Sequence, residues 1–422
     1  MAISCTYEYD ADIPSDTSII VIDGQILAGG TSSVSVSKAT RLDGADESAP
    51  LYATGILRGE DGSEIQGTTQ ANGWFEGTSP FSSYYPGDFK GGYSTGVSIS
   101  FPSEYLQKGQ KYKLFIDAGE NGSFESDWLT INKAPVLDKL GYIEHEGVMS
   151  GSYYSGRYVD FTVSAHSDSS PYFMVSFEEA WEYTALENSS LEYNPETNQI
   201  VEAYSWPLEH PYYRCWRSSG MLTLAISAAG HTEKTINDAI VTSISAYNEK
   251  ISVLYRLTVN VGCATKEYQE FWDNLQQISY ADGDLFTPIP SNMEGNIHRT
   301  SGSGVVLGFV SASEVASDHM YYTGNGFHRT SPERNTLRRE FTYFTPNYDH
   351  PDDYFQYYHP DASEWHRAYM NGNVPWRNAI DANGEEIPGL YLWANKNCLD
   401  CRFFGGDITF PSDWPDRNDP NL

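Results

Sequence analysis

Histidine and carboxylate side chains gather near the carboxyl end of the 422-residue chain, between residues 349 and 366. Such a mixture could hold a metal ion or supply a proton-transfer pair for hydrolysis. Its spacing matches no regular zinc pattern, and acidic surfaces commonly carry similar mixtures. We therefore expect a solvated surface without a metal ion, and an acid/base hydrolase is only the third of our hypotheses. The residues concerned are His350, His359 and His366 among Asp349, Asp352, Asp353, Asp361 and Glu364.

Two other sets of carboxylates invite a chemical interpretation. The loop DAGENGSFESD, from Asp117 to Asp127, has the density of oxygen donors that calcium prefers, but it lacks the EF-hand order and lies where a hairpin turn is expected. Glu178 and Glu179 would serve glycoside hydrolysis only if they faced each other across a cleft, whereas neighbours on a strand point to opposite faces. No GxSxG, HExxH, P-loop or GxGxxG motif is present. We predict no enzyme, no catalytic residue, no metal site and no cofactor.

The five cysteines are an odd number, so an oxidising compartment would leave one of them unpaired or otherwise used. Cys398 and Cys401 form a CxxC motif, but it does not open a helix after a strand, as a thioredoxin-like motif does. Cys263 ends an apolar strand and is expected to be a buried thiol. A disulfide that includes Cys398 or Cys401, formed either between them or with Cys215, would staple the C-terminal region. The sequence does not choose among these pairings.

The composition limits the kinds of partner. Lys and Arg total 26 and Asp and Glu total 57, so the formal net charge is −31. Nucleic acids and anionic membrane surfaces are polyanions, and such a chain repels them. The charge is typical of a soluble secreted or surface protein, although it could also attract cations or a basic ligand. No run of eighteen apolar residues is present, so no helix is predicted to span a membrane.

Aromatic residues are abundant, with 31 Tyr, 19 Phe and 10 Trp. Aromatic and β-branched side chains favour β-sheets, because they pack well on a half-buried pleat. The densest aromatic stretch lies in the last hundred residues. We single out Tyr354, Phe355, Tyr357 and Tyr358 there as a candidate binding surface for a glycan or a protein. Packing within a sheet is the alternative for each of these side chains.

Short alternating segments separated by turns occupy the first third of the chain, including a hairpin signal at Asp61-Gly62. They predict an immunoglobulin-like β-sandwich over residues 18–135. Residues 136–422 are expected to form a larger β-rich domain. Its one helix is predicted near 265–281, because Tyr268, Phe271, Trp272 and Leu275 repeat at intervals of three and four after the N-cap residue Thr265. The predicted fold class is therefore mainly β.

Several motifs follow one another in a characteristic order: IIVIDGQI, RCW, EYQEFWDNL, DLFTPIPSNMEGNI, VLGFVSAS, CLDC, GG and DWP. This order resembles the domain-of-unknown-function family 4249, outer-membrane lipoproteins of Bacteroidota. The resemblance covers nearly the whole chain, and its second half is the specific part. It implies a cell-surface accessory protein of a TonB-dependent outer-membrane transporter, and it transfers no catalytic residue.

The resemblance also suggests a role for Cys5, which ends the lipobox-like sequence AISC. We expect Cys5 to carry a lipid anchor, and its acyl chains would exceed the two lipid signals that stable anchoring requires. Residues 1–17 would then be the lipobox-like start and a flexible tether. Glu8, Asp10 and Asp12 resemble the acidic stretch that directs lipoproteins of this phylum to the outer face. The expected location is the outer membrane, lipid-anchored and exposed at the cell surface.

The resulting hypothesis is a non-enzymatic surface lipoprotein that binds a TonB-dependent outer-membrane β-barrel transporter in nutrient uptake. A stand-alone adhesion module that binds a glycan, a peptide or a protein is the alternative.

Overall fold

A computed structural model of the protein describes residues 19–38, 51–71, 96–150, 153–204, 210–219, 222–228, 234–280, 295–331, 334–335, 337, 362–380 and 383–415. The protein is mainly β, as predicted. Cys5, the predicted tether and most of the stretch from 349 to 366 lie outside the described residues. The same holds for the four candidate binding aromatics Tyr354, Phe355, Tyr357 and Tyr358.

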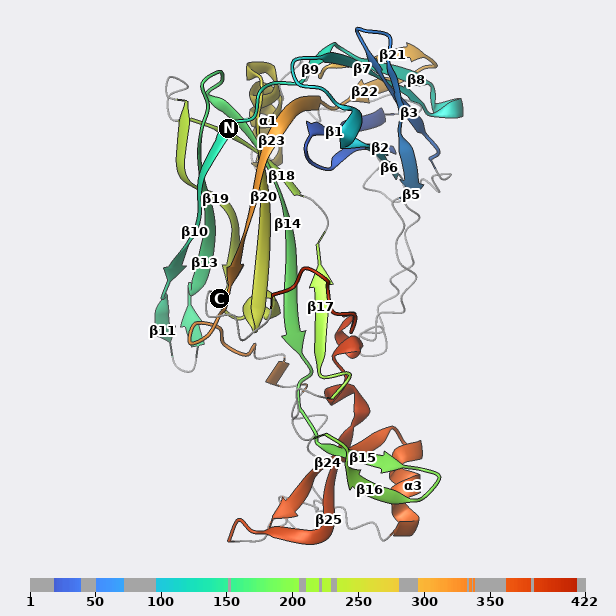
Figure 1. Ribbon diagram of the computed structural model, residues 1–422, viewed down its shortest axis with the longest axis vertical. Coiled ribbons are helices and arrows are strands. Elements are labelled where there is room, and N and C mark those ends of the chain that lie inside the picture. The colour runs from blue at the N-terminus through green and yellow to red at the C-terminus, as the bar shows by residue number, and fades with distance from the viewer. Residues whose placement is uncertain are drawn as a thin grey trace, which may run out of the picture.

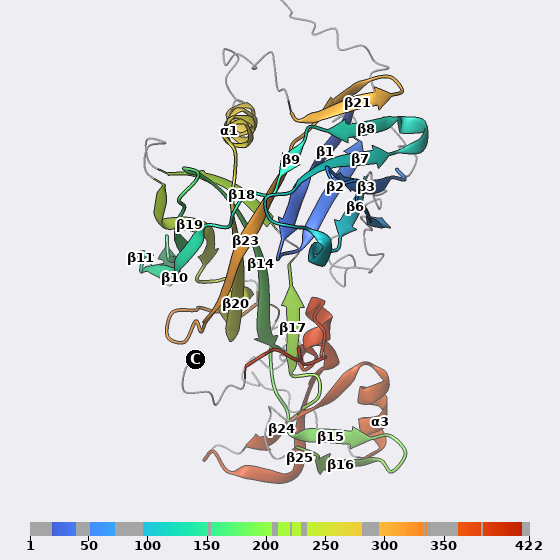
Figure 2. The same ribbon diagram turned by 45° about the horizontal axis from the view of Figure 1, so that its top comes forward.

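The N-terminal strands build two sheets that lie face to face (Figure 1, Figure 2). The first layer contains β1 (Ile19–Ala28), β2 (Ser32–Lys38), β6 (Gly96–Phe101) and β5 (Thr68–Ala71), in that order. The second contains β8 (Ser123–Ser126), β7 (Lys111–Asp117), β3 (Thr54–Gly59) and β4 (Glu64–Gln66), with β9 (Leu129–Thr130) also paired to β7. Two short 3-10 helices, η1 (Ser103–Tyr105) and η2 (Gly119–Asn121), lie in the connections.

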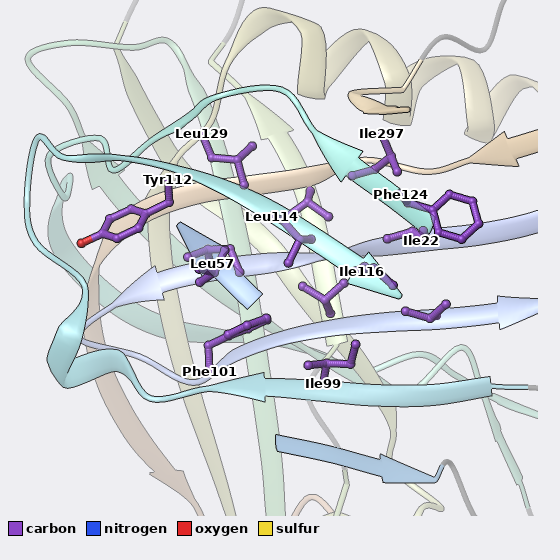
Figure 3. Close-up of a cluster of buried hydrophobic side chains, with 14 of the residues drawn as sticks. Ile22, Leu57, Ile99, Phe101, Tyr112, Leu114, Ile116, Phe124, Leu129 and Ile297 are labelled. Carbon is purple, nitrogen blue, oxygen red and sulfur yellow. The ribbon is translucent and has the colours of Figure 1, made fainter. Parts of the chain in front are cut away.

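Apolar side chains from both layers meet in one core (Figure 3). Ile22 and Ile99 come from the first layer, and Leu114, Ile116 and Phe124 come from the second. Each is at most 2% exposed, and burying one such side chain contributes about 1.5–3 kcal/mol. The period-2 alternation of each strand therefore assigns one face to the core and the other to the outside.

Three strands from much later in the chain complete this sandwich. They are β21 (Ile297–Ser301), β22 (Val305–Leu307) and β23 (Val310–Tyr322). β21 pairs with β8, and both β22 and β23 pair with β1 in parallel. The N-terminal sandwich therefore does not end at the predicted boundary of residue 135, because it also includes these three later strands. Without these strands β1 and β8 would each present an open edge.

A second unit continues the first layer through β23 into a long sheet. β23 pairs with β20 (Leu254–Cys263), which pairs with β14 (Tyr172–Thr184), and β14 also pairs with β17 (Arg214–Ser218) and β18 (Leu222–Ser227). A separate three-stranded sheet, β10 (Val136–His145), β13 (Tyr158–His166) and β19 (Thr235–Ser245), packs against it through a second core. The hairpin of β10 and β13 is prolonged by β11 (Val148–Ser150) and β12 (Tyr153–Ser155), and η5 (Glu249–Ile251) precedes β20.

The predicted helix near 265–281 is confirmed as α1 (Lys266–Tyr280). The Thr265 hydroxyl accepts a hydrogen bond from the amide of Tyr268 at 3.3 Å, as an N-cap does. Tyr268 and Phe271 are buried against Leu27 of β1 and Phe309. No helix in the part of the chain that the structure describes is both long enough and apolar enough to cross a membrane.

A small unit at the far end of the molecule was not predicted (Figure 1). It combines β15 (Leu191–Asn194), β16 (Gln199–Glu202), α3 (Ala362–Met370), β24 (Asn373–Ile380) and β25 (Glu386–Asn395). Its core is Tyr193, Ala368 and Trp393. The short helix α3 was missed in the sequence because it has only nine residues, too few for a clear periodic signal.

Cys215 on β17 and Cys401, at the start of η7 (Cys401–Phe404), form a disulfide across a sequence separation of 186. Cys398 is buried in η6 (Lys396–Cys398) and lies outside this disulfide. Cys263 is a buried thiol, 3.2 Å from the Ser167 hydroxyl. The CxxC motif thus holds the C-terminal segment to β17 through its second cysteine.

Removing this disulfide by Cys215→Ala with Cys401→Ala should lower the free energy of unfolding by about 2–5 kcal/mol, because the unfolded chain regains a long loop. Denaturant titration with and without reductant measures the change. Reductant should destabilise the wild type and Cys263→Ala, the matched control, but not the double variant. Equal responses of all three proteins would contradict the assignment.

Candidate functional site

The calcium-like loop forms the turn between β7 and β8, and its carboxylates have separate partners. Glu125 forms an ion pair with Lys113 at 2.6 Å, and Asp127 contacts His298 at 3.0 Å. Asp117 accepts a hydrogen bond from a backbone amide two residues on. Among the described residues, no group of three or more His, Cys, Asp or Glu side chains is placed to hold a metal ion.

Buried glutamates on and just after β14 are a second set of candidate acid/base groups. Glu178 is exposed and Glu179 is buried, so these neighbours do point to opposite faces. Glu179, Glu182 and Glu187 are each at most 5% exposed, and each contacts a cationic side chain. Buried charges persist only when paired in this way, which explains these residues structurally. The contacts are Glu179 with Lys250 (2.5 Å) and the Tyr255 hydroxyl (2.8 Å), Glu182 with Arg214 (2.7 Å), and Glu187 with Arg377 (3.0 Å).

A serine, an aspartate and a histidine also form a hydrogen-bonded line across β10, β13 and β19. The Ser243 hydroxyl donates to one carboxylate oxygen of Asp160 at 2.5 Å, and His145 Nε2 lies 2.9 Å from the other. A nucleophilic triad requires the histidine between serine and carboxylate, where it can accept the hydroxyl proton. Here the carboxylate is central. The line therefore ties three strands together and does not activate Ser243.

An exposed hairpin edge is the first surface suited to binding. We call β10 and β11 together the edge hairpin. β10 is the outermost strand of its sheet and pairs with β13 alone among the described strands. Five large apolar side chains on it are between 47% and 73% exposed, namely Val136, Tyr142, Ile143, Val148 and Met149. An edge strand with exposed apolar side chains is a template for pairing with another chain.

The outer face of the first layer is the second such surface, and we call it the polar face. Strand register places its side chains in two rows across β1, β2, β6 and β5, because residues directly opposite in a ladder share a face. One row is Gln25, Ser33, Ser100 and Thr68, and the other is Asp23, Ser35, Ser98 and Gln70.

Two groups at the β1 side of the polar face are withdrawn from solvent. Gln25 is 5% exposed, and its Nε2 donates to the Thr223 hydroxyl at 2.5 Å. Its Oε1 is buried without a hydrogen-bond partner in the described part of the chain. Burial also raises the pKa of the Asp23 carboxyl. The alternating serines of SVSVS and SIS are visible in the sequence, but strand pairing was needed to show that they form one surface.

The family described as Domain of unknown function (DUF4249) matches residues 6–319. The chain belongs to this family. The match ends within β23, so the far-end unit of this DUF4249 protein contains elements, α3, β24 and β25, that lie beyond it. No curated protein matches the chain.

Among solved structures, this DUF4249 protein is similar to a DUF4785 family protein from Legionella pneumophila, with 10% identity and a TM-score of 0.18 over 57% of this chain. The chain spans about half (51%) of that protein. It is also similar to the MSCRAMM ACE of Enterococcus faecalis, described as binding its ligands by the collagen Hug model, with 12% identity and a TM-score of 0.13 over 59% of this chain and 89% of that one. Overlap this low supports no conclusion about fold or function.

Replacing Glu182 by Gln should lower the free energy of unfolding by about 3–5 kcal/mol, because it leaves the Arg214 guanidinium without its buried counter-charge. Glu178→Gln on the same strand is the matched control, and as an exposed site it should change stability by less than about 0.5 kcal/mol. Chemical denaturation of both variants provides the comparison. Equal effects at the two positions would contradict a structural role for the buried pair.

Proposed function

We propose that this protein is a non-enzymatic surface lipoprotein, anchored through Cys5, that binds a TonB-dependent outer-membrane transporter and assists nutrient uptake. The order of motifs described above supports this proposal, since members of the family it resembles look like lipoproteins and are often encoded beside such transporters. The edge hairpin carries the proposal, because it is a surface that the fold leaves available for another protein.

The hairpin suits one kind of occupant, an extended segment of the transporter. The outer side of β10 offers backbone N–H and C=O groups that pair with no other described strand. An added strand would satisfy them, and pockets for alternate side chains would provide specificity. Ile143 on β10 and Met149 on β11 supply apolar contact area beside that edge.

Charge restricts the segment further. The whole chain carries −31, although Glu146 in the loop between β10 and β11 is paired with Arg157 at 3.1 Å. Like charges brought together across an interface cost several kcal/mol, so an acidic segment would be rejected. We therefore propose that the transporter presents a neutral or basic segment to the hairpin.

The enzymatic alternative has little support in the described residues. An acid/base hydrolase would need converging carboxylates with perturbed pKa values in a pocket. The buried glutamates Glu179, Glu182 and Glu187 instead contact cations on separate elements. The stand-alone adhesion module remains the second candidate, and the polar face is the observation that favours it.

Ile143→Lys combined with Met149→Lys should reduce the amount of transporter that co-purifies with the tagged protein by at least about tenfold. A loss of about 1.4 kcal/mol in binding free energy is enough to weaken a complex tenfold. The added charges oppose a basic segment and remove the apolar contacts. The protein, exported with a signal peptide, would be purified from mildly solubilised outer membranes and its partners identified by mass spectrometry.

Leu222→Lys combined with Ile240→Lys is the matched control, because these side chains are 53% and 54% exposed on β18 and β19. It should retain the transporter. Cys5→Ala should release the protein from the membrane fraction. Two results would overturn the proposal: a wild-type protein that reaches the outer membrane and is recovered alone, or a hairpin variant that still recovers the transporter.

A further inference from the structure

We propose that the polar face is a binding site for a neutral, hydroxyl-rich ligand of the oligosaccharide class. This inference goes beyond transporter binding and depends on no part of it. It supplies a location for ligand binding on strands β1, β2, β6 and β5, distant in the sequence from the edge hairpin.

The two rows space their polar groups regularly. Neighbouring strands lie about 4.8 Å apart, and same-face residues along a strand are about 6.6–6.8 Å apart. The two rows therefore present hydroxyl and amide groups on a regular grid, comparable with the separations of hydroxyls on successive sugar rings. Ser33 Oγ and Ser98 Oγ, which lie diagonally across the rows, are 2.8 Å apart and hydrogen-bonded. The hydroxyls thus stay close to the sheet and leave a shallow surface.

The rows consist almost entirely of uncharged hydroxyl and amide side chains. Outward sheet faces in contact only with water commonly carry long charged side chains, yet Asp23 is the sole ionisable residue among the eight. Serine and threonine can each donate and accept, and glutamine adds both functions at a longer reach. Such groups match a ligand made of hydroxyls. The chain's negative charge disfavours an anionic ligand on the same surface.

The side chain of Gln25 favours a bound ligand on the polar face over water alone. It lies directly opposite Ser33 and is more than nine-tenths buried. With Nε2 committed to Thr223, its Oε1 remains a buried acceptor without a partner in the described residues. A buried acceptor that is left without a hydrogen bond destabilises the fold. Because Oε1 is buried, a ligand hydroxyl reaches it only when the side chains that cover it move aside, and its hydrogen bond to Oε1 would then remove this cost.

Binding can be measured by isothermal titration of the purified protein with named neutral oligosaccharides: maltohexaose, cellohexaose, xylohexaose, laminarihexaose and mannohexaose. We expect at least one to bind with a Kd below about 1 mM. Ser35→Leu with Ser98→Leu should weaken that binding by at least about tenfold. Ser35→Thr with Ser98→Thr should retain it, because the hydroxyls remain.

The matched control is Ser245→Leu with Ser317→Leu, two exposed serines on β19 and β23. It should bind like the wild type, and thermal melts should show that every variant is folded. The inference is overturned if none of the five oligosaccharides binds, or if binding survives in the folded Ser35→Leu/Ser98→Leu variant. The titration contains no transporter, so its failure would leave the transporter proposal standing, and the reverse also holds.

Discussion

The pairing of one strand with two different neighbours holds the main body of the protein together. Residues 310–314 of β23 run parallel to β1, and residues 315–322 run antiparallel to β20. The N-terminal sandwich and the long second sheet therefore share one continuous backbone. At its far end Tyr322 packs on Tyr142 at 4.8 Å and donates a hydrogen bond to Glu144 at 2.7 Å. The same strand thus supports both the polar face, through β1, and the edge hairpin, through β10.

Several of the protein's cationic side chains form ion pairs that stabilise the fold. Lys250, Arg214 and Arg377 each neutralise a buried glutamate. Arg256 binds Asp413 at 2.5 Å and lies 5.5 Å from the Trp414 ring, which fastens the C-terminal segment. Cations engaged in this way cannot balance the remaining carboxylates. Each buried pair is neutral, so the other ionised groups carry the whole net charge of −31. Both proposed ligands suit such a protein, since the transporter segment is neutral or basic and the oligosaccharide is uncharged.

Local patterns predicted local structure well. The alternation in β2 and β6 and the spacing of three and four in α1 correspond to the observed elements, because each depends on neighbouring residues alone. Long-range pairing was not predictable in the same way. β1 meets β23 across almost three hundred residues, and β15–β16 joins β24–β25 from opposite sides of the second unit's sequence. The pairing of Cys215 with Cys401 and the counter-ions of the buried glutamates belong to this second class. No single stretch of sequence contains both partners, so the boundary at 135 and the far-end unit were beyond local inference.

The core determines which positions of the polar face point outward, but it does not determine which polar side chains occupy them. Shifting β2 by one residue would turn Val34 and Val36 outward, so the register that buries them also turns Ser33 and Ser35 to the other side. The core therefore dictates that these positions face outward, but any polar side chain would satisfy that demand. Short hydroxyl side chains on β2 and β6, lying beside a buried glutamine with an unmet acceptor, are not explained by packing. A ligand that uses those hydroxyls accounts for both features at once.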